Sequence, residues 1–216
     1  MKKKLLAIGC SFTYGEELPD PTTQAWPALL AQDLDYELTN QGVCGGSNDY
    51  IFRQAIEATS LVPYDLIVIQ WTERSRAETW NEWDRAPVNI SANPSGGVVI
   101  DHLLPWVKDY YKYSYNDLFA YRTWTIKILA LQQYFKSRNQ PYIMVGVSGI
   151  PNYKSYYELR DHFGYLWRQI DTERYVGWPH EGLQEWYRDA PLAPGGHPLE
   201  LGHRKIADEI AKYIRN

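Results

Sequence analysis

A serine near the start of the chain and a histidine near its end have the types and surroundings needed for acyl chemistry. Ser11 follows the apolar run 5–8 and has small neighbours, in the segment Gly9-Cys10-Ser11-Phe12-Thr13-Tyr14-Gly15. Small residues at the end of a strand let backbone N–H groups approach a reacting atom, as a nucleophilic serine requires. His197 precedes an amphipathic C-terminal stretch and could take the serine proton. The pair predicts a serine hydrolase.

Each half of this pair has a structural alternative. A serine after a glycine often caps a turn or a helix. A second histidine, His203, lies six residues beyond His197. His203 falls inside the predicted C-terminal helix, so we expect it to pack or to form a hydrogen bond, and we expect His197 to be the base.

The elements that must position these residues alternate between strands and helices. Apolar runs predict strands at 5–8, 36–39, 65–71 and 142–147, and helical spacing predicts helices at 26–34, 51–61, 117–136 and 199–214. The run 66–69 is continuously apolar, which is typical of a strand that is covered on both faces. The pattern therefore predicts an α/β fold with a mostly parallel sheet.

Two long stretches rich in aromatic residues break this alternation. The first, at about 74–116, is interpreted as an insertion above the sheet with a turn at 93–97, and the second spans about 149–196. Long irregular segments are uncommon in compact domains unless they form lids or binding walls. We expect most of the aromatic residues to anchor the core or the loops, and the alternative is that they frame a ligand site.

Composition limits the classes of protein to consider. The 216 residues, 44% of them hydrophobic, predict one domain over 1–216, and a formal net charge of −4 argues against nucleic-acid binding. No apolar run approaches the roughly 18–20 residues of a membrane span. Two cysteines cannot build a disulfide framework, and no zinc-ligand spacing is present, so we expect no metal. Oligomeric state is left open.

The N-terminus superficially imitates a lipoprotein signal. Only five uncharged residues separate Lys4 from Cys10, however, fewer than the roughly 7–15 of an export signal. We therefore expect a reduced, cytoplasmic protein. An oxidation-sensitive pair of Cys10 and Cys44 is the alternative if both belong to site loops.

Four segments, in order, resemble the signature blocks of the SGNH superfamily, also called GDSL-type hydrolases. These enzymes cleave ester and related acyl bonds with a serine and a histidine on a flavodoxin-like, three-layer α/β/α sandwich. The segment 9–15 is similar to the first block, with Cys10 where the family usually has aspartate. The segment 40–47 is similar to the second, and the resemblance assigns Gly45 as a backbone donor to the oxyanion. The resemblance implies that no cofactor is needed.

The third block departs from the family pattern. The family usually has an asparagine after the third strand that completes the oxyanion hole, whereas here the chain continues with Thr72 and has no asparagine in that segment. Thr72 could donate one hydroxyl hydrogen bond, and Arg74 or Arg76 could add positive charge. In the structural alternative, Thr72 caps the strand end and the arginines face solvent or pair with Glu73 and Glu78.

The last block departs as well. The family usually places an aspartate three residues before the histidine, and Pro194 occupies that position here. His197 could be oriented instead by Asp189, by Glu185 or by a backbone carbonyl, so that Ser11 and His197 would act as a dyad.

Together these observations predict a serine esterase or deacetylase. Ser11 and His197 would be catalytic, and Ser11, Gly45 and Thr72 would form the oxyanion hole. The 9 tryptophans and 18 tyrosines favour a small-molecule or carbohydrate ester, such as an O-acetylated glycan, over a long-chain lipid. The alternatives are a binding module for a glycan or a protein that has lost turnover, and an acyltransferase that uses the same residues.

Overall fold

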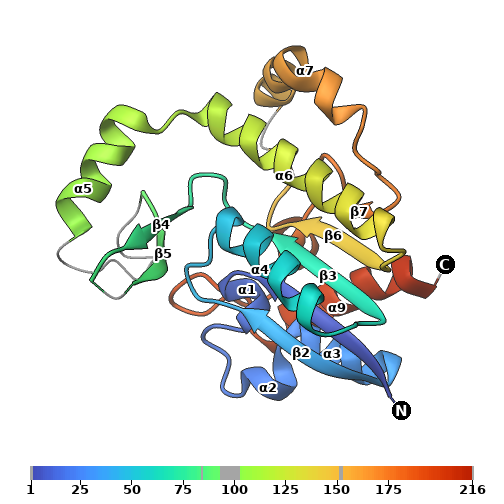
Figure 1. Ribbon diagram of the computed structural model, residues 1–216. Helices are drawn as coiled ribbons and strands as arrows, with labels where there is room; N and C mark the ends of the chain where they lie inside the picture. The colour runs from blue at the N-terminus through green and yellow to red at the C-terminus, as the bar shows by residue number, and fades with distance from the viewer. Residues whose placement is uncertain (1, 84, 93–102, 151–152, 216) are drawn as a thin grey trace.

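A parallel five-stranded sheet forms the centre of the structure, a computed structural model that describes residues 2–83, 85–92, 103–150 and 153–215 (Figure 1). Its order is β2-β1-β3-β6-β7, and every neighbouring pair is parallel. The strands are β1 (Lys3–Gly9), β2 (Tyr36–Gly42), β3 (Leu66–Trp71), β6 (Tyr142–Gly146) and β7 (Tyr175–Val176). This is the flavodoxin-like strand order, and the predicted α/β sandwich is confirmed.

Helices cover both faces of the sheet and form the outer layers. One face carries α3 (Trp26–Leu34), α8 (Leu183–Tyr187) and α9 (Glu200–Arg215), and the other carries α4 (Asn48–Leu61), α6 (Asp117–Ser137) and α7 (Tyr153–Trp167). Strand side chains alternate between faces. Leu5 and Ala7 of β1 therefore pack under α3 and α9, whereas Leu6 and Ile8 pack under α4 and α6.

The carboxyl ends of the central strands meet at one edge of the sheet. Gly9 pairs with Gly42 and Ile8 with Ile69, so β1, β2 and β3 end at nearly the same level. The short helices α1 (Ser11–Tyr14) and α2 (Pro21–Gln24) follow β1. Ligands of open α/β sheets bind at this edge, and the first three sequence blocks all leave the sheet here.

The two stretches that interrupt the alternation have more regular structure than the sequence suggested. The insertion at 74–116 contains the antiparallel hairpin β4 (Ala77–Asn81) and β5 (Ala86–Ile90), then α5 (Leu104–Asp109) and the π-helical segment η3 (Tyr110–Ser114). It extends from the sheet at the left of Figure 1. The stretch 149–196 contains α7, β7 and α8. The turn predicted at 93–97 lies outside the described residues.

In the described part of the chain, no helix is both long and apolar enough to cross a membrane.

Candidate active site

Ser11, His197 and Glu17 form a continuous line of hydrogen-bonded side chains. Ser11 Oγ lies 2.9 Å from His197 Nε2, and His197 Nδ1 lies 2.8 Å from a carboxylate oxygen of Glu17. A hydroxyl, an imidazole and a carboxylate in this order are the parts of a serine hydrolase triad. Sequence reasoning paired the first two residues across 186 positions but did not find the third.

The turn after β1 presents the serine. Cys10 is extended, Ser11 begins α1, and Gly15 ends that helix with a φ of 90°. Because Ser11 is the first helical residue, its N–H has no intrahelical acceptor. Among the described residues, no hydrogen-bond acceptor is paired with it. The N–H is therefore available to a ligand.

Gln70, at the end of β3, braces this turn from beneath. Its fully buried side-chain oxygen accepts hydrogen bonds from the Cys10 N–H and the Thr13 hydroxyl, both at 3.0 Å, and the Cys10 thiol lies 3.3 Å away. A Cβ at Gly9 would lie only 2.1 Å from the Thr13 hydroxyl oxygen and 2.6 Å from the Gln70 oxygen. The glycine is thus required by close packing. Sequence reasoning missed Gln70, since a polar residue within an apolar strand was its only signal.

Glu17 reaches His197 from the segment that follows α1. Its backbone has a φ of 68°, in the left-handed region that few residues other than glycine adopt. The second carboxylate oxygen accepts a hydrogen bond from the Gly195 N–H at 2.8 Å. The hydrogen bonds from His197 and then from Gly195 hold the pKa of Glu17 below its usual value of 4.5. Glu17 is therefore a carboxylate at neutral pH.

The acids proposed from sequence to orient His197 are not the ones that contact it. Glu185 uses a carboxylate oxygen to accept from the N–H groups of Gly149 and Gly182, which stabilises the start of α8. Asp189 is exposed. The expectation of Asp189, Glu185 or a backbone carbonyl was wrong. The carboxylate belongs to Glu17, which is 180 residues before His197, so the residues around His197 give no sign of it.

A tight turn fixes His197 itself. The Ala193 N–H donates to the His197 carbonyl at 2.8 Å, and the Gly196 N–H donates to the Ala193 carbonyl at 2.9 Å. Gly196 has a φ of 87°, which favours glycine. The ring of Phe12 lies 5.3 Å from the imidazole, so the residue after Ser11 also packs on His197.

His203 is fully buried, and its Nδ1 accepts a hydrogen bond from the Trp26 N–H at 3.1 Å. Burial lowers the pKa of His203 to about 4, so the ring is neutral at physiological pH. This agrees with the structural role expected from its position in the C-terminal helix.

A second carboxylate, Glu16, lies beside the serine and the histidine. One of its oxygens is 3.3 Å from His197 Nε2. Burial, and then the negative charge of Glu16, raise the pKa of Cys44 to about 12. Because thiol oxidation proceeds through the thiolate, this shift argues against the oxidation-sensitive pair of Cys10 and Cys44.

Gly45 and Thr72 lie in the loops that leave the same edge of the sheet. Gly45 is buried in the turn closed by the Gly46 N–H and the Val43 carbonyl, has a φ of 73°, and its N–H has no acceptor among the described residues. The buried hydroxyl of Thr72 has no hydrogen-bond partner there either.

The hydroxyl of Thr72 does not cap the strand, because the side chain of Asn48 does. Asn48 Oδ1 accepts from the Thr72 N–H at 2.9 Å, and its amide donates to the Thr72 carbonyl at 3.1 Å. The structural alternative for Thr72 was therefore wrong, and its hydroxyl is available as a donor.

The arginines after β3 do not form the ion pairs considered from sequence. The Arg74 guanidinium lies over the rings of Tyr121 and Trp124, 4.5 Å and 5.2 Å from their centroids. Glu78 pairs with Arg53 instead. Both carboxylate oxygens of Glu78 accept from Arg53, and the described residues show no ion pair of Arg74 or Arg76 with Glu73 or Glu78.

Comparison with known proteins adds a family and a fold. The DUF6071 family, described as a family of unknown function, matches residues 19–216. No curated protein matches the sequence.

Several solved structures are similar over nearly their whole length. A member of the lipolytic protein G-D-S-L family from Veillonella parvula is 14% identical, with 97% of each chain covered and a TM-score of 0.53. The psychrotrophic esterase EstA from a Pseudoalteromonas species is 14% identical, with 99% of this chain and 97% of that chain covered and a TM-score of 0.57. The acetylxylan esterase Axe2 from Geobacillus stearothermophilus, in a mutant form, is 18% identical, with 98% and 94% covered and a TM-score of 0.54. The chain has the fold of the GDSL-type hydrolases, as predicted.

Proposed function

The chain belongs to DUF6071, a family of unknown function, and we propose that this member is a serine hydrolase that cleaves an acyl ester. The observation that carries the proposal is the line from Ser11 through His197 to Glu17, with separations of 2.9 Å and 2.8 Å. Three side chains from distant parts of the sequence converge in the order that nucleophilic catalysis requires.

The reaction uses this line of side chains twice. His197 Nε2 takes the proton of Ser11 as Oγ attacks the acyl carbon, and the same nitrogen then protonates the leaving alcohol. A water molecule next gives its proton to Nε2 and attacks the acyl-enzyme, which releases the acid and returns the proton to Ser11. Glu17 keeps the other proton of the ring on Nδ1 and stabilises the imidazolium that forms.

Three donors are proposed to stabilise the oxyanion. The N–H groups of Ser11 and Gly45 and the hydroxyl of Thr72 all lie at the carboxyl edge of the sheet and are unpaired within the described residues. Donors that are already in place cost no reorganisation when charge develops. The hydroxyl would take over the role of the family's missing asparagine.

We propose a carbohydrate ester, such as an O-acetylated glycan, as the substrate. The insertion carries three exposed tryptophans, Trp80, Trp83 and Trp106, and indole rings stack on the apolar faces of sugars. An acetylxylan esterase with the same fold supports this choice by analogy.

The rival function, a binding module without turnover, was favoured by the missing aspartate before His197 and the missing asparagine after β3. The first of these arguments is weakened, because Glu17 places a carboxylate beside His197 from another segment. Acyl transfer would use the same residues with a different acceptor, so it does not alter the roles proposed for Ser11 and His197.

The test is hydrolysis of p-nitrophenyl acetate combined with labelling by a fluorophosphonate. We expect turnover and a label on Ser11 in the wild type, and loss of both in Ser11→Ala. In His197→Ala, turnover should fall by about 10³-fold or more. Ser60→Ala removes an exposed serine hydroxyl on α4 and should behave as the wild type. A wild type that neither turns over acetyl esters nor reacts with the probe would contradict the proposal.

A further inference from the structure

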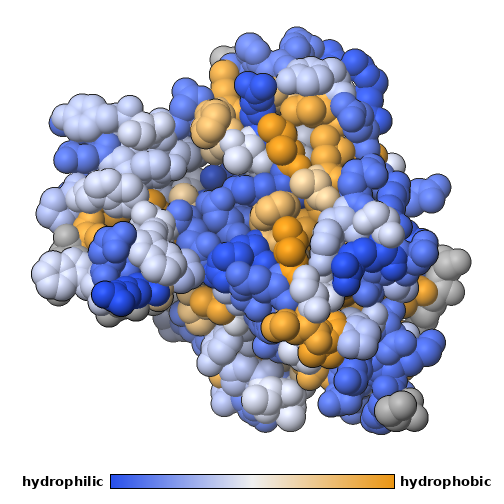
Figure 2. Space-filling view, viewed as in Figure 1, coloured by the Kyte–Doolittle hydropathy of each residue, from blue (hydrophilic) through white to orange (hydrophobic). Residues whose placement is uncertain are grey.

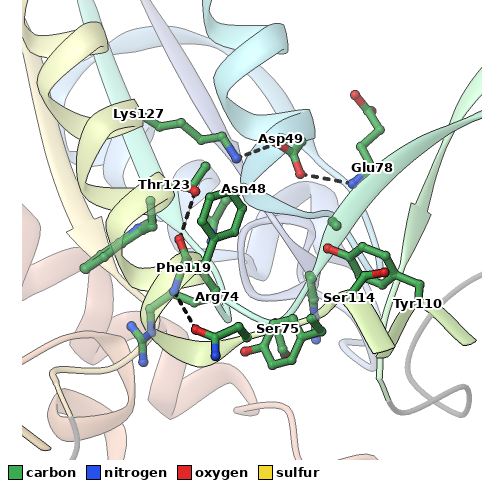
Figure 3. Close-up of a pocket in the computed structure, with 16 residues that line it drawn as sticks. Asn48, Asp49, Arg74, Ser75, Glu78, Tyr110, Ser114, Phe119, Thr123 and Lys127 are labelled. Carbon is green, nitrogen blue, oxygen red and sulfur yellow. Dashed lines mark hydrogen bonds and ion pairs between the residues drawn. The ribbon is translucent and has the colours of Figure 1, made fainter. Parts of the chain in front are cut away.

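A cavity of about 420 Å³ lies between the insertion and helices α4 and α6 (Figure 3). Its walls come from residues 74–78 after β3, from Tyr110 and Tyr115 of the insertion, from 119–127 of α6, and from the start of α4. In Figure 2 the surface between the insertion and the main body is hollowed and mostly hydrophilic. The mechanism proposed above makes no use of this cavity.

The charged groups of the cavity leave one positive charge in excess. Three cationic side chains, Arg74, Arg76 and Lys127, and two acidic ones, Asp49 and Glu78, line it. Lys127 pairs with Asp49 (Figure 3), and Glu78 pairs with Arg53, which lies outside the lining. A cationic cavity in a protein with a net charge of −4 points to an anionic ligand.

Two of the lining cations, Arg74 and Arg76, have no carboxylate partner among the described residues, and Arg74 lies over the rings of Tyr121 and Trp124 instead. The Arg76 guanidinium makes one long contact, 3.5 Å, with the Gly46 carbonyl. The side chain is half-buried, so water can solvate it only partly. A partly desolvated charge without a partner is costly. A carboxylate could accept two parallel hydrogen bonds from the guanidinium and remove that cost.

The cavity lies close to the nucleophile, because one loop separates them. Arg76 contacts the carbonyl of Gly46, and a Cβ built on Gly46 would lie 3.5 Å from the Cα of Cys10, the residue before Ser11. Asn48, which lines the cavity, holds the backbone of Thr72. The loop at Gly46 therefore borders both Arg76 and the residue before Ser11.

We propose that this cavity binds the carboxylate of an acidic sugar, next to the sugar unit whose ester is cleaved at Ser11. A single excess positive charge matches a monoanion such as a uronic acid better than a phosphate dianion. The rings of Tyr110 and Phe119 line the cavity and offer apolar surfaces to the sugar. Glu16, beside Ser11, would disfavour a second anionic group at the ester itself. The position of the ester rests on the proposed function, whereas the binding of the carboxylate does not.

Binding is tested by titration calorimetry on Ser11→Ala protein with unacetylated ligands, so that no turnover is needed. We expect an aldotriouronic acid, which is xylobiose carrying one glucuronic acid unit, to bind at least tenfold more tightly than neutral xylotriose and than a xylotriosyl phosphate. Adding Arg76→Gln should weaken binding of the aldotriouronic acid by about tenfold or more, because it removes a charge-assisted hydrogen bond. Arg122→Gln removes the same charge from an exposed position on α6 and should change affinity less than twofold.

The outcomes separate this inference from the proposed function. Equal affinity for the acidic and the neutral trisaccharide overturns the inference without any variant, as does tighter binding of the phosphorylated sugar. Equal losses in Arg76→Gln and Arg122→Gln also overturn it, since a general charge effect would then suffice. Binding of the aldotriouronic acid that depends on Arg76, in a protein that hydrolyses no ester, would uphold the site and reject the esterase.

A kinetic comparison tests the position of the ester. We expect the ratio of kcat/KM for acetylated xylo-oligosaccharides that carry one glucuronic acid unit to that for acetylated neutral xylo-oligosaccharides to fall about tenfold in Arg76→Gln. It should stay within twofold of the wild type in Arg122→Gln. An unchanged ratio in Arg76→Gln would show that the carboxylate is not held while the ester reacts.

Discussion

Glu17 places beside His197 the carboxylate that the sequence pattern around the histidine lacks. It occupies a left-handed backbone conformation, and both its carboxylate oxygens are hydrogen-bonded, one to His197 and one to the Gly195 N–H. A strained conformation persists only where the surroundings fix it, and such positions cluster at functional sites. The strain and the two bonds together argue for a positioning role.

We expect Glu17→Gln to lower kcat for p-nitrophenyl acetate by about 10²-fold or more. The amide carries no charge to stabilise the imidazolium and can hold the ring in the wrong tautomer. Asp189→Asn, which alters an acid that sequence reasoning considered, should stay within twofold of the wild type. Steady-state kinetics of the two variants show which acid orients His197. A larger loss of kcat in Asp189→Asn than in Glu17→Gln would reject Glu17.

The proposed role of Thr72 in the oxyanion hole can be tested by removing its hydroxyl group. Thr72→Val removes a buried hydroxyl that has no partner among the described residues, so we expect thermal unfolding to be unchanged or to occur at a slightly higher temperature. We expect kcat to fall by about tenfold to a hundredfold, because a donor to the oxyanion is lost. Unchanged kcat in the folded variant would remove Thr72 from the site.

At the scale of elements, the site depends on the pairing of β1 with β3. The register between them places Gln70 beneath the turn after Gly9, where it satisfies the Cys10 N–H and the Thr13 hydroxyl. A buried donor that loses its acceptor costs more than the bond itself contributed. The serine is therefore held in position by the neighbouring strand rather than by its own segment.

Gln70→Leu should lower both stability and activity. We expect the free energy of unfolding to fall by about 2 kcal/mol or more, as two buried donors lose their acceptor, and kcat to fall because the turn can shift. Gln132→Leu is a matched control, since Gln132 is equally buried but bonds the backbone of Asp171 in both directions. It should lose stability and keep kcat. Urea unfolding and kinetics on both variants test this, and equal loss of kcat in the two would contradict the bracing role.

The elements themselves were predictable to different degrees. The strands and helices with long apolar or helical patterns, such as 65–71 and 117–136, were found close to where they were predicted. The hairpin of β4 and β5 was not, because its strands are short and half-exposed, and they pair with each other rather than with the sheet. β7 has two residues, too few for any periodicity to show.

At the scale of the whole molecule, the two hydrophobic clusters share the same strands. Alternate residues of β1 and β3 belong to opposite clusters. Disrupting either cluster therefore disturbs strands that also carry side chains of the other cluster. We propose that the chain is one cooperative unit.

Ile128→Ala on α6 and Ile206→Ala on α9 probe the two clusters separately. Each removes a fully buried side chain and should lower the free energy of unfolding by about 2–5 kcal/mol. We expect tryptophan fluorescence and far-ultraviolet circular dichroism to give one coincident urea transition in the wild type and in both variants. Two separated transitions, or a shift seen by only one probe, would show that the faces unfold independently.

The sequence by itself determined the α/β class, the choice of Ser11 and His197 as candidate residues, and the glycine-rich loop. Apolar periodicity and small residues in turns can be recognised within short segments of the chain. Only the tertiary structure decided that Glu17 contacts His197, that Gln70 braces the turn before Ser11, and that Arg76 lines a cavity without a carboxylate partner among the described residues. Those contacts join residues such as Glu17 and His197, 180 positions apart. Their pairing follows from strand order and loop geometry, and no local pattern encodes either.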